Sequence, residues 1–288
     1  MPRPDAAIAY REMARDDIQA GLQLCRASQW NQLQRDWEIL LALSPRGARV
    51  AVKDQNIVGT VATVTYAGGV SWIAMVLVAP AARGGGIGTQ LVREGIALLA
   101  DVPHIRLDAT PAGREVYQRL GFKDEYPLSR MIRAAAGGAA GLQAASVRRM
   151  TAADLPRVRL LDQEVFGVDR GPLLEFQLAG APEYAWVHES DGRLTGFVMG
   201  RHGHNAEHLG PVTASDQTVA KALVATCLQE HPGTSFVLDI SRHSREWVDW
   251  IASLGFRELR PFMRMCHGHV PAIGAPARQW AVFGPEFG

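Results

Sequence analysis

The chain of 288 residues is long enough for one large domain or two of ordinary size, and its 47% hydrophobic and 20% charged residues are typical of a globular protein. Thirty Lys and Arg residues against 29 Asp and Glu leave a net charge of +1, so no strong overall field would recruit nucleic acid or an anionic membrane. No apolar run approaches the ~20 residues of a membrane span, which favours a soluble protein with a small-molecule partner.

The cysteines and the N-terminal segment indicate the compartment. Cys25, Cys227 and Cys266 are scattered and form no CxxC pair, which suits a reducing compartment and argues against a structural zinc site. Residues 1–17 include acidic side chains and no continuous apolar segment, so a secretory signal is not expected. We therefore expect a cytoplasmic protein.

Hydrophobic periodicity predicts a regular order of helices and strands in the first half of the chain. Apolar residues at helical spacing predict helices at 16–28, 34–43, 89–102 and 113–120. Alternating or continuous β-rich runs predict strands at 49–54, 57–67, 71–79, 104–110 and 129–134. This order of elements implies an α/β fold whose mixed sheet is partly antiparallel.

The second half of the chain repeats the pattern of the first. VYQRLGFKDEYPLSRM at 116–131 is matched by VDWIASLGFRELRPFMRM at 248–265. Other matched segments keep the same order in both halves, which is typical of a duplicated domain. The Ala/Gly segment at 134–145 has little to bury and reads as a linker. The sequence thus predicts two tandem domains, at 1–133 and 146–288.

Four glycines, Gly84, Gly85, Gly86 and Gly88, stand between a predicted strand and a predicted helix. The first turn of a helix has backbone N–H groups without intrahelical partners, and the helix dipole is positive there. Glycine lets a diphosphate approach these groups with no Cβ in the way, and Arg83 would add a charge-assisted hydrogen bond. The alternative is a turn that only needs positive φ. The spacing fits neither a GK[ST] nor a GxGxxG nucleotide loop.

Two blocks of the sequence resemble one family. RGGGIG at 83–88 resembles the acetyl-CoA pyrophosphate loop of the GNAT N-acetyltransferases, [RQ]-x-x-G-x-[GA], and LDATPAGREVYQRLGF at 107–122 resembles a later block that ends in Y-x-x-x-G-F. The resemblance covers roughly residues 8–133 and, through the repeat, 146–266, and it extends to a tandem subgroup. It implies two GNAT-like acyl-CoA N-acyltransferase domains, with acetyl-CoA as co-substrate and a primary amine of a small molecule or peptide as acceptor. A non-catalytic acyl-CoA sensor is the alternative.

The same resemblance implies roles for individual residues. In this family the strand before the loop splays from its neighbour, so that the backbone of Val76 and Val78 would pair with the pantetheine arm. The Val76 N–H would also polarise the thioester carbonyl. Tyr117 would donate a proton to the leaving thiolate, unless it is a core tyrosine bonded to backbone. The implied cofactor-binding residues are Val76, Val78, Arg83, Gly84, Gly85, Gly86, Ile87, Gly88 and Thr89.

The acceptor would lie near the segment between the first two predicted helices, which lines the acceptor pocket in this family. Trp30, Asn31 and Gln32 occupy that segment, although Trp30 could equally belong to the core. Asp108 is a further candidate for the acceptor site, with an alternative role as a cap of the following turn.

The group that would take the proton from the amine stays open at this point. The strand at 71–79 contains no Asp or Glu, although GNAT enzymes commonly place a general base there. The remaining candidates are Asp108, Glu38, Asp36 and His104, or a chain of water molecules that leads to bulk solvent.

The second half has lost the residues implied in the chemistry. Alignment of the two LGF segments places Ile251 where Tyr117 stands, and TASDQT at 213–218 has neither an arginine nor a glycine run. Asp216 would repel a diphosphate. We expect this domain to keep the fold without the cofactor and to shape the acceptor pocket or an interface, with 278–288 forming a last strand and a tail packed on it. The oligomeric state, including a homodimer, stays open.

Two polar segments of the second half are candidates for a metal site or for contacts with the acceptor. His202, His204 and His208 have no acidic or Cys partner at metal-ligand spacing, so we expect a polar turn and no metal. The segment at 166–178 could fold over the first domain's pocket, with Asp169 and Arg170 either as specificity contacts or as a local ion pair.

Overall fold

The computed structural model describes residues 7–135, 146–268 and 273–288, so most of the predicted linker lies outside the described residues. The first half follows the predicted order, with an additional short strand, β1, whose mostly exposed residues give no apolar alternation. The strands are β1 (Ala9–Glu12), β2 (Ala48–Lys53), β3 (Asn56–Tyr66), β4 (Val70–Val78), β5 (His104–Ala109) and β6 (Phe122–Arg133). The helices are α1 (Ile18–Ala27), α2 (Gln34–Leu43), α3 (Ile87–Leu98) and α4 (Pro111–Arg119).

The second half has the same order and adds one strand near the end of the chain. The strands are β7 (Val147–Arg149), β8 (Trp186–Ser190), β9 (Arg193–Arg201), β10 (Glu207–Ala214), β11 (Phe236–Ser241), β12 (Arg257–His267) and β13 (Gln279–Ala281). The helices are α5 (Leu155–Phe166), α6 (Gly171–Gly180), α7 (Gln217–Glu230) and α8 (Arg245–Ser253). Short 3₁₀ turns lie at Arg15–Asp17, Pro80–Ala82, Ala152–Asp154, Pro182–Tyr184 and Pro276–Arg278. Within the described part of the chain, every helix is too short or too polar to cross a bilayer.

Helices cover both faces of the first half's strands. Side chains of successive strand residues point to opposite faces, so Ile73 of β4 belongs to the buried cluster that includes Leu91 of α3, and Trp72 belongs to the cluster that includes Leu40 of α2. The prediction of a mixed α/β fold is confirmed by this arrangement and by the sheet, in which β4 pairs with β5 in parallel and with β3 antiparallel.

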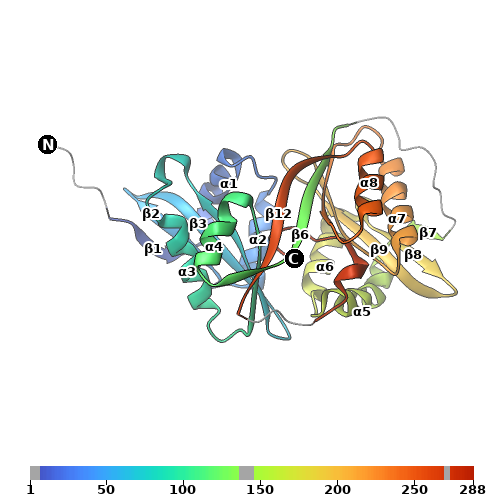
Figure 1. Cartoon of the computed structure of the whole chain (residues 1–288), viewed down its shortest axis with the longest axis horizontal. Helices are drawn as coiled ribbons and strands as arrows, with labels where there is room; N and C mark the ends of the chain where they lie inside the picture. The colour runs from blue at the N-terminus through green and yellow to red at the C-terminus, as the bar shows by residue number, and fades with distance from the viewer. Residues whose placement is uncertain (1–6, 136–145, 269–272) are drawn as a thin grey trace.

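One sheet runs through both halves, in the order β1-β2-β3-β4-β5-β12-β6-β11-β13-β10-β9-β8-β7. The last strand of each repeat pairs with the other repeat: β12 lies antiparallel to β5, and β6 lies antiparallel to β11. The two exchanged strands also pair with each other, and they run side by side through the middle of the molecule (Figure 1). The halves are therefore joined by a central pair of crossing strands.

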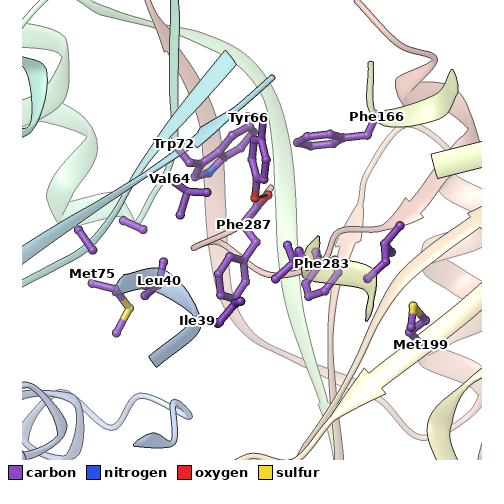
Figure 2. Close-up of a cluster of buried hydrophobic side chains, with 14 of the residues drawn as sticks. Ile39, Leu40, Val64, Tyr66, Trp72, Met75, Phe166, Met199, Phe283 and Phe287 are labelled. Atoms are coloured by element: carbon purple, nitrogen blue, oxygen red, sulfur yellow. Dashed lines mark hydrogen bonds between the residues drawn. The ribbon is translucent and has the colours of Figure 1, made fainter. Parts of the chain in front are cut away.

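The final residues of the chain pack between the two halves. β13 pairs with β10 and β11, as expected for a last strand on the second half. The segment after it crosses to the first half, where Tyr66 donates a hydrogen bond of 2.9 Å to the carbonyl of Phe287. Figure 2 shows Phe283 and Phe287 among side chains such as Ile39 and Trp72 of the first half. The tail is thus a core element shared by both repeats.

Candidate functional site

The glycine loop leaves a row of backbone donors open. Gly84 and Gly86 have φ values of 84° and 78°, which other residues adopt only with strain. The amide N–H groups of residues 84–89 donate no hydrogen bond to any described residue, and the first donor of the helix is Gln90, bonded to the Gly86 carbonyl at 3.0 Å. A Cβ at Gly84 or Gly86 would meet nothing within 4 Å. Glycine allows the positive φ values of the loop and leaves its N–H groups uncovered by a side chain. A diphosphate could therefore approach these N–H groups.

A groove with about 2120 Å³ of empty space, counted with its open mouth, extends from this loop. One wall is the end of β4, including Val76 and Val78, and the opposite wall is α4 with Tyr117. Of the predicted cofactor-binding residues, those that line this groove are Val76, Val78, Arg83, Gly84, Gly86, Ile87, Gly88 and Thr89. Gly85 lies in the same loop.

A bulge in β4 opens the strand toward the groove. Met75 has a φ of 53°, and the pairing with β3 shifts between Ala62↔Ala74 and Thr60↔Leu77. The Thr60 hydroxyl fixes the bulge by donating a hydrogen bond of 2.8 Å to the Met75 carbonyl. β4 pairs with β5 only as far as Trp72, so the two strands separate beyond it. The expected splay is present, and it exposes the backbone around Val76.

Tyr117 has a hydroxyl without a hydrogen-bond partner among the described residues. Its ring leans against Gly113, where a Cβ would come within 2.8 Å of the Tyr117 Cε2 atom, and lies 6.0 Å from the ring of Phe122. Burial raises the pKa of Tyr117 to about 12, so the phenol is protonated at neutral pH. The alternative, a core tyrosine whose hydroxyl is hydrogen-bonded to backbone, is therefore not observed. The Tyr117 hydroxyl is available to donate a hydrogen bond into the groove.

An inner pocket with about 580 Å³ of empty space, again with its mouth, joins the groove at Trp30, Val76, Thr110, Tyr117 and Arg260. Part of its wall comes from the second half of the chain. The contributing residues are Arg260 and Phe262 of β12 and Pro285 and Glu286 of the tail. The strand exchange and the tail thus complete a pocket of the first half.

The predicted acceptor residues divide into two groups. Trp30, Gln32 and Asp108 line the inner pocket. Asn31 does not, because its side chain is bonded to the β9–β10 loop: its Nδ2 donates to the Ala206 carbonyl at 2.8 Å and its Oδ1 accepts from the Asn205 N–H at 2.8 Å. Asn31 thus connects the two halves, and its role in acceptor binding stays a prediction.

Most candidate bases are engaged elsewhere. Asp36 accepts hydrogen bonds from Arg201 at 2.9 Å and from the Leu33 N–H at 2.7 Å, and Glu38 accepts one from Gln34 at 2.8 Å. Neither carboxylate lines the inner pocket.

Asp108 lines the pocket as expected but is paired with Arg264, whereas His104 lies outside the pocket. Asp108 reaches the pocket, but Arg264 binds both of its oxygens at 2.8 Å, and the cap of α4 is the Thr110 hydroxyl, not Asp108. His104 stands at the far end of β5 from Asp108 and does not line the pocket.

Glu286 is a pocket carboxylate that the sequence did not indicate. It is only 2% exposed, and its Oε1 accepts hydrogen bonds from Gln32 Nε2 at 3.1 Å and from Arg201. Burial favours the neutral acid, but Arg201 outweighs it and holds the pKa of Glu286 below its usual value, so the group is ionised. No local pattern pointed to it because GPEFG reads as a tail and Gln32 lies 254 residues away.

In the second half, the equivalent helix start is closed. Asp216 Oδ1 accepts hydrogen bonds from the N–H groups of Thr218 at 2.8 Å and Val219 at 3.0 Å, so the donors at the start of α7 are already used. Ile251, the counterpart of Tyr117, is completely buried. Both observations support a second repeat without cofactor.

The histidines of the second half are tied into local polar contacts. His202 lies between Glu183 and Glu207, with distances of 3.2 and 2.8 Å, and His208 Nε2 lies 3.2 Å from Asp239. Among the residues at 7–135, 146–268 and 273–288, no three His, Cys, Asp or Glu side chains are grouped to hold a metal ion.

Asp169 and Arg170 form local ion pairs outside the inner pocket. Asp169 accepts a hydrogen bond of 2.7 Å from Arg159, and Arg170 pairs with Asp162 at 2.7 Å. Arg170 also donates to the carbonyl of Gly288 at 2.6 Å, so it holds the tail in place.

Comparisons with known proteins find a matching family domain in each half of the chain. Family models described as "Acetyltransferase (GNAT) domain" match residues 45–124 and 158–279. A relative named holothin acyltransferase, from Pseudoalteromonas sp. (strain SANK 73390), is 26% identical over 249 residues, covering 85% of this chain and 83% of that protein.

Solved structures share the fold over nearly the whole chain. A putative acetyltransferase from Pyrococcus horikoshii has a TM-score of 0.81 at 21% identity, covering 98% of this chain and 96% of that one. A tandem GNAT protein from the clavulanic acid biosynthesis pathway has a TM-score of 0.63 at 14% identity, covering 92% and 100%. With two matching domains in one continuous sheet, the chain belongs to the GNAT acetyltransferase family and is a tandem acyltransferase of that family.

Proposed function

We propose that the first repeat transfers an acetyl group from acetyl-CoA to the primary amine of a small-molecule acceptor by direct attack. The observation that carries the proposal is the connection of two spaces: a groove that begins at the six open N–H groups of residues 84–89 meets the inner pocket at Val76 and Tyr117. A donor cofactor and an acceptor would meet at that junction.

The residues of the groove fit coenzyme A along its length. The open N–H groups and the positive end of α3 suit its diphosphate, with Arg83 beside them. The splayed edge of β4 suits the amide-bearing pantetheine arm. At the junction, the Val76 N–H would stabilise the oxyanion that develops on the thioester carbonyl. Tyr117 would protonate the departing thiolate, because its hydroxyl is protonated and accepts or donates no hydrogen bond within the described parts of the chain.

The walls of the inner pocket favour a small acceptor over a peptide. They come from both halves of the chain and from the tail, so side chains bound the space at the junction on several sides. Concave sites of this kind are typical of small-molecule binding. The relative named as a holothin acyltransferase supports acyl transfer as the activity.

The test is release of the CoA thiol. Purified protein is mixed with acetyl-CoA and, in turn, with tryptamine, spermidine, glucosamine and L-lysine, and free thiol is followed with a colorimetric reagent. We expect amine-dependent release, and propionyl-CoA and hexanoyl-CoA assayed in parallel rank the donors. Binding of CoA without thiol release for any amine would favour the alternative, a non-catalytic acyl-CoA sensor. Binding of ATP in place of CoA would overturn both.

A further inference from the structure

We infer that Glu286, from the last segment of the chain, takes the proton from the acceptor amine, and that Gln32 orients the amine beside it. The inference rests on the proposed function for its reaction, and it assigns the general base that the strand β4 lacks. Glu286 and Gln32 line the inner pocket together with Val76 and Tyr117, where the cofactor groove opens into it.

Both side chains are held firmly. Glu286 is 2% exposed and Gln32 is 4% exposed. The neighbouring Phe287 packs into the shared core near Ile39 and Tyr66, as Figure 2 shows, and its carbonyl is bonded to the Tyr66 hydroxyl. The carboxylate therefore sits on an anchored backbone, although it comes from the end of the chain.

Each of the two side chains presents an oxygen without a partner. Gln32 Nε2 and Arg201 both donate to Glu286 Oε1, and Oε2 makes no hydrogen bond to the described residues. Gln32 Oε1 is buried and has no partner in the described parts of the chain. Reversing the amide would place its oxygen against the carboxylate, so this orientation is fixed by the hydrogen bond. A buried acceptor without a donor is costly, which points to a ligand that brings N–H groups.

The carboxylate of Glu286 suits an amine, because carboxylate oxygens accept hydrogen bonds from N–H groups. Arg201 is shared between Glu286 and Asp36, so one guanidinium faces two carboxylates. Asp108 is the other pocket carboxylate, but Arg264 satisfies both of its oxygens.

The two arginines that line the pocket differ in their ion pairing. Arg130 is paired with Asp239 through two hydrogen bonds of 2.7 Å. Arg260 has no ion pair within the described residues and lies where the pocket meets the groove. Glu286 is therefore the pocket carboxylate with an oxygen left for the acceptor.

The reaction begins with the amine and the thioester at the junction of pocket and groove. The free amine attacks the thioester carbon, and the new N–C bond places a positive charge on nitrogen. Glu286 Oε2 accepts one N–H proton while Gln32 Oε1 accepts a hydrogen bond from the other. The C–S bond then breaks, and the sulfur takes the proton of the Tyr117 hydroxyl. The proton on Glu286 leaves to solvent and Tyr117 is reprotonated, which gives the amide and CoA thiol.

The test uses the full chain with the best of the four amines named above. We expect Glu286→Gln to lower kcat roughly 100-fold to 1,000-fold while the Kd for CoA stays within about twofold. Addition of sodium formate should restore part of the turnover of Glu286→Ala, which a purely structural role would not allow. Gln32→Leu should mainly raise the KM for the amine. Glu164→Gln is the matched control, because it removes a carboxylate from a surface pair with Arg278 and should leave kcat unchanged.

A second readout is independent of turnover. Crystals soaked in ethylammonium chloride should show the cation between Glu286 Oε2 and Gln32 Oε1 in the native chain, and not in Glu286→Gln. If the native chain releases no thiol with any amine, the proposed function fails and the soak still decides the subsite. If Glu286→Gln turns over within threefold of the native chain, or the cation binds elsewhere, the inference is overturned. Loss of folding in both Glu286 variants with no cation in the native pocket also overturns it.

Discussion

Arg264 of β12 and Asp108 of β5 stand opposite each other in the sheet and form a buried ion pair with two hydrogen bonds of 2.8 Å. The repeat-related residues Arg130 of β6 and Asp239 of β11 form the same pair, with two hydrogen bonds of 2.7 Å. In both cases the arginine is on an exchanged strand and the aspartate belongs to the other repeat. The ion pairs therefore connect the halves at the floor of the site, where Asp108 and Arg130 both line the inner pocket.

Breaking one of these pairs should destabilise the protein strongly. Asp239→Asn leaves the Arg130 guanidinium buried without its counter-charge, so we expect the free energy of unfolding to fall by about 3–5 kcal/mol. Urea unfolding followed by tryptophan fluorescence measures the change. The control is Asp249→Asn, which removes an exposed pair with Arg245 on α8 and should cost less than about 1 kcal/mol. Equal, small effects of both variants would contradict a structural role for the buried pair.

Acid should weaken the second repeat through Asp154. Hydrogen bonds from Arg148, at 2.9 and 2.7 Å, hold the pKa of Asp154 well below its usual value. A carboxyl group with a lowered pKa stabilises the fold fully above its unfolded pKa of about 4, and that contribution is lost as the pH falls below it. Between pH 5 and pH 3, the native chain should therefore lose more stability than Asp154→Asn. The difference between the two unfolding curves isolates this group, and parallel curves would refute the assignment.

The local features of this protein could be predicted from its sequence, because they depend on residues close together in the chain. The helical and strand periodicities and the glycine loop before α3 follow from neighbouring residues, whereas the place of Tyr117 in the site was implied by the resemblance to the GNAT family. The repeat was visible because the LGF segments at 120–122 and 254–256 lie in matching order.

The exchange of the strands β6 and β12 between the two halves could not be predicted from the sequence. The strands β6 and β12 carry closely similar patterns, SRM and MRM, and either one could complete either half of the sheet. For the same reason, the sequence indicated neither Glu286 as a pocket residue nor the contacts that the Asn31 side chain makes. Their partners, Gln32 and the β9–β10 loop, are brought to them only by the tertiary fold.

A charge in the glycine loop should abolish binding of coenzyme A. Gly86→Glu places a carboxylate at the proposed diphosphate site, beside the open N–H groups. We expect the Kd for CoA to rise at least roughly 100-fold, which is a loss of about 2.8 kcal/mol of binding free energy. Calorimetric titration measures it. Gly192→Glu is the matched control, since Gly192 also has positive φ and no neighbour within 4 Å of a Cβ, but lies in the β8–β9 turn. Normal CoA binding by Gly86→Glu would show that the loop is not the diphosphate site.

Loss of the Tyr117 hydroxyl should affect the chemical step more than binding. Tyr117→Phe keeps the ring packed against Phe122 and removes only the proton donor, so we expect kcat to fall roughly 10-fold to 100-fold with little change in the KM for acetyl-CoA. Since the pKa of Tyr117 is raised to about 12, its deprotonation should not limit the native enzyme at any pH up to about 10. Tyr10→Phe, on the edge of the sheet at β1, is the control. An unchanged kcat for Tyr117→Phe would assign the thiolate's proton to another source.

The closed helix start in the second repeat predicts one coenzyme A per chain. Asp216 already uses the N–H groups of Thr218 and Val219, and its carboxylate adds negative charge where a diphosphate would have to sit. Calorimetric titration with CoA should therefore give a stoichiometry of one. Removing the cap in Asp216→Ala should cost about 1 kcal/mol of stability without adding a second site, because α7 is preceded by no glycine loop and Ile251 fills the position of the proton donor. A stoichiometry of two in the native chain, or two after this substitution, would mean that the second repeat retains a cofactor site.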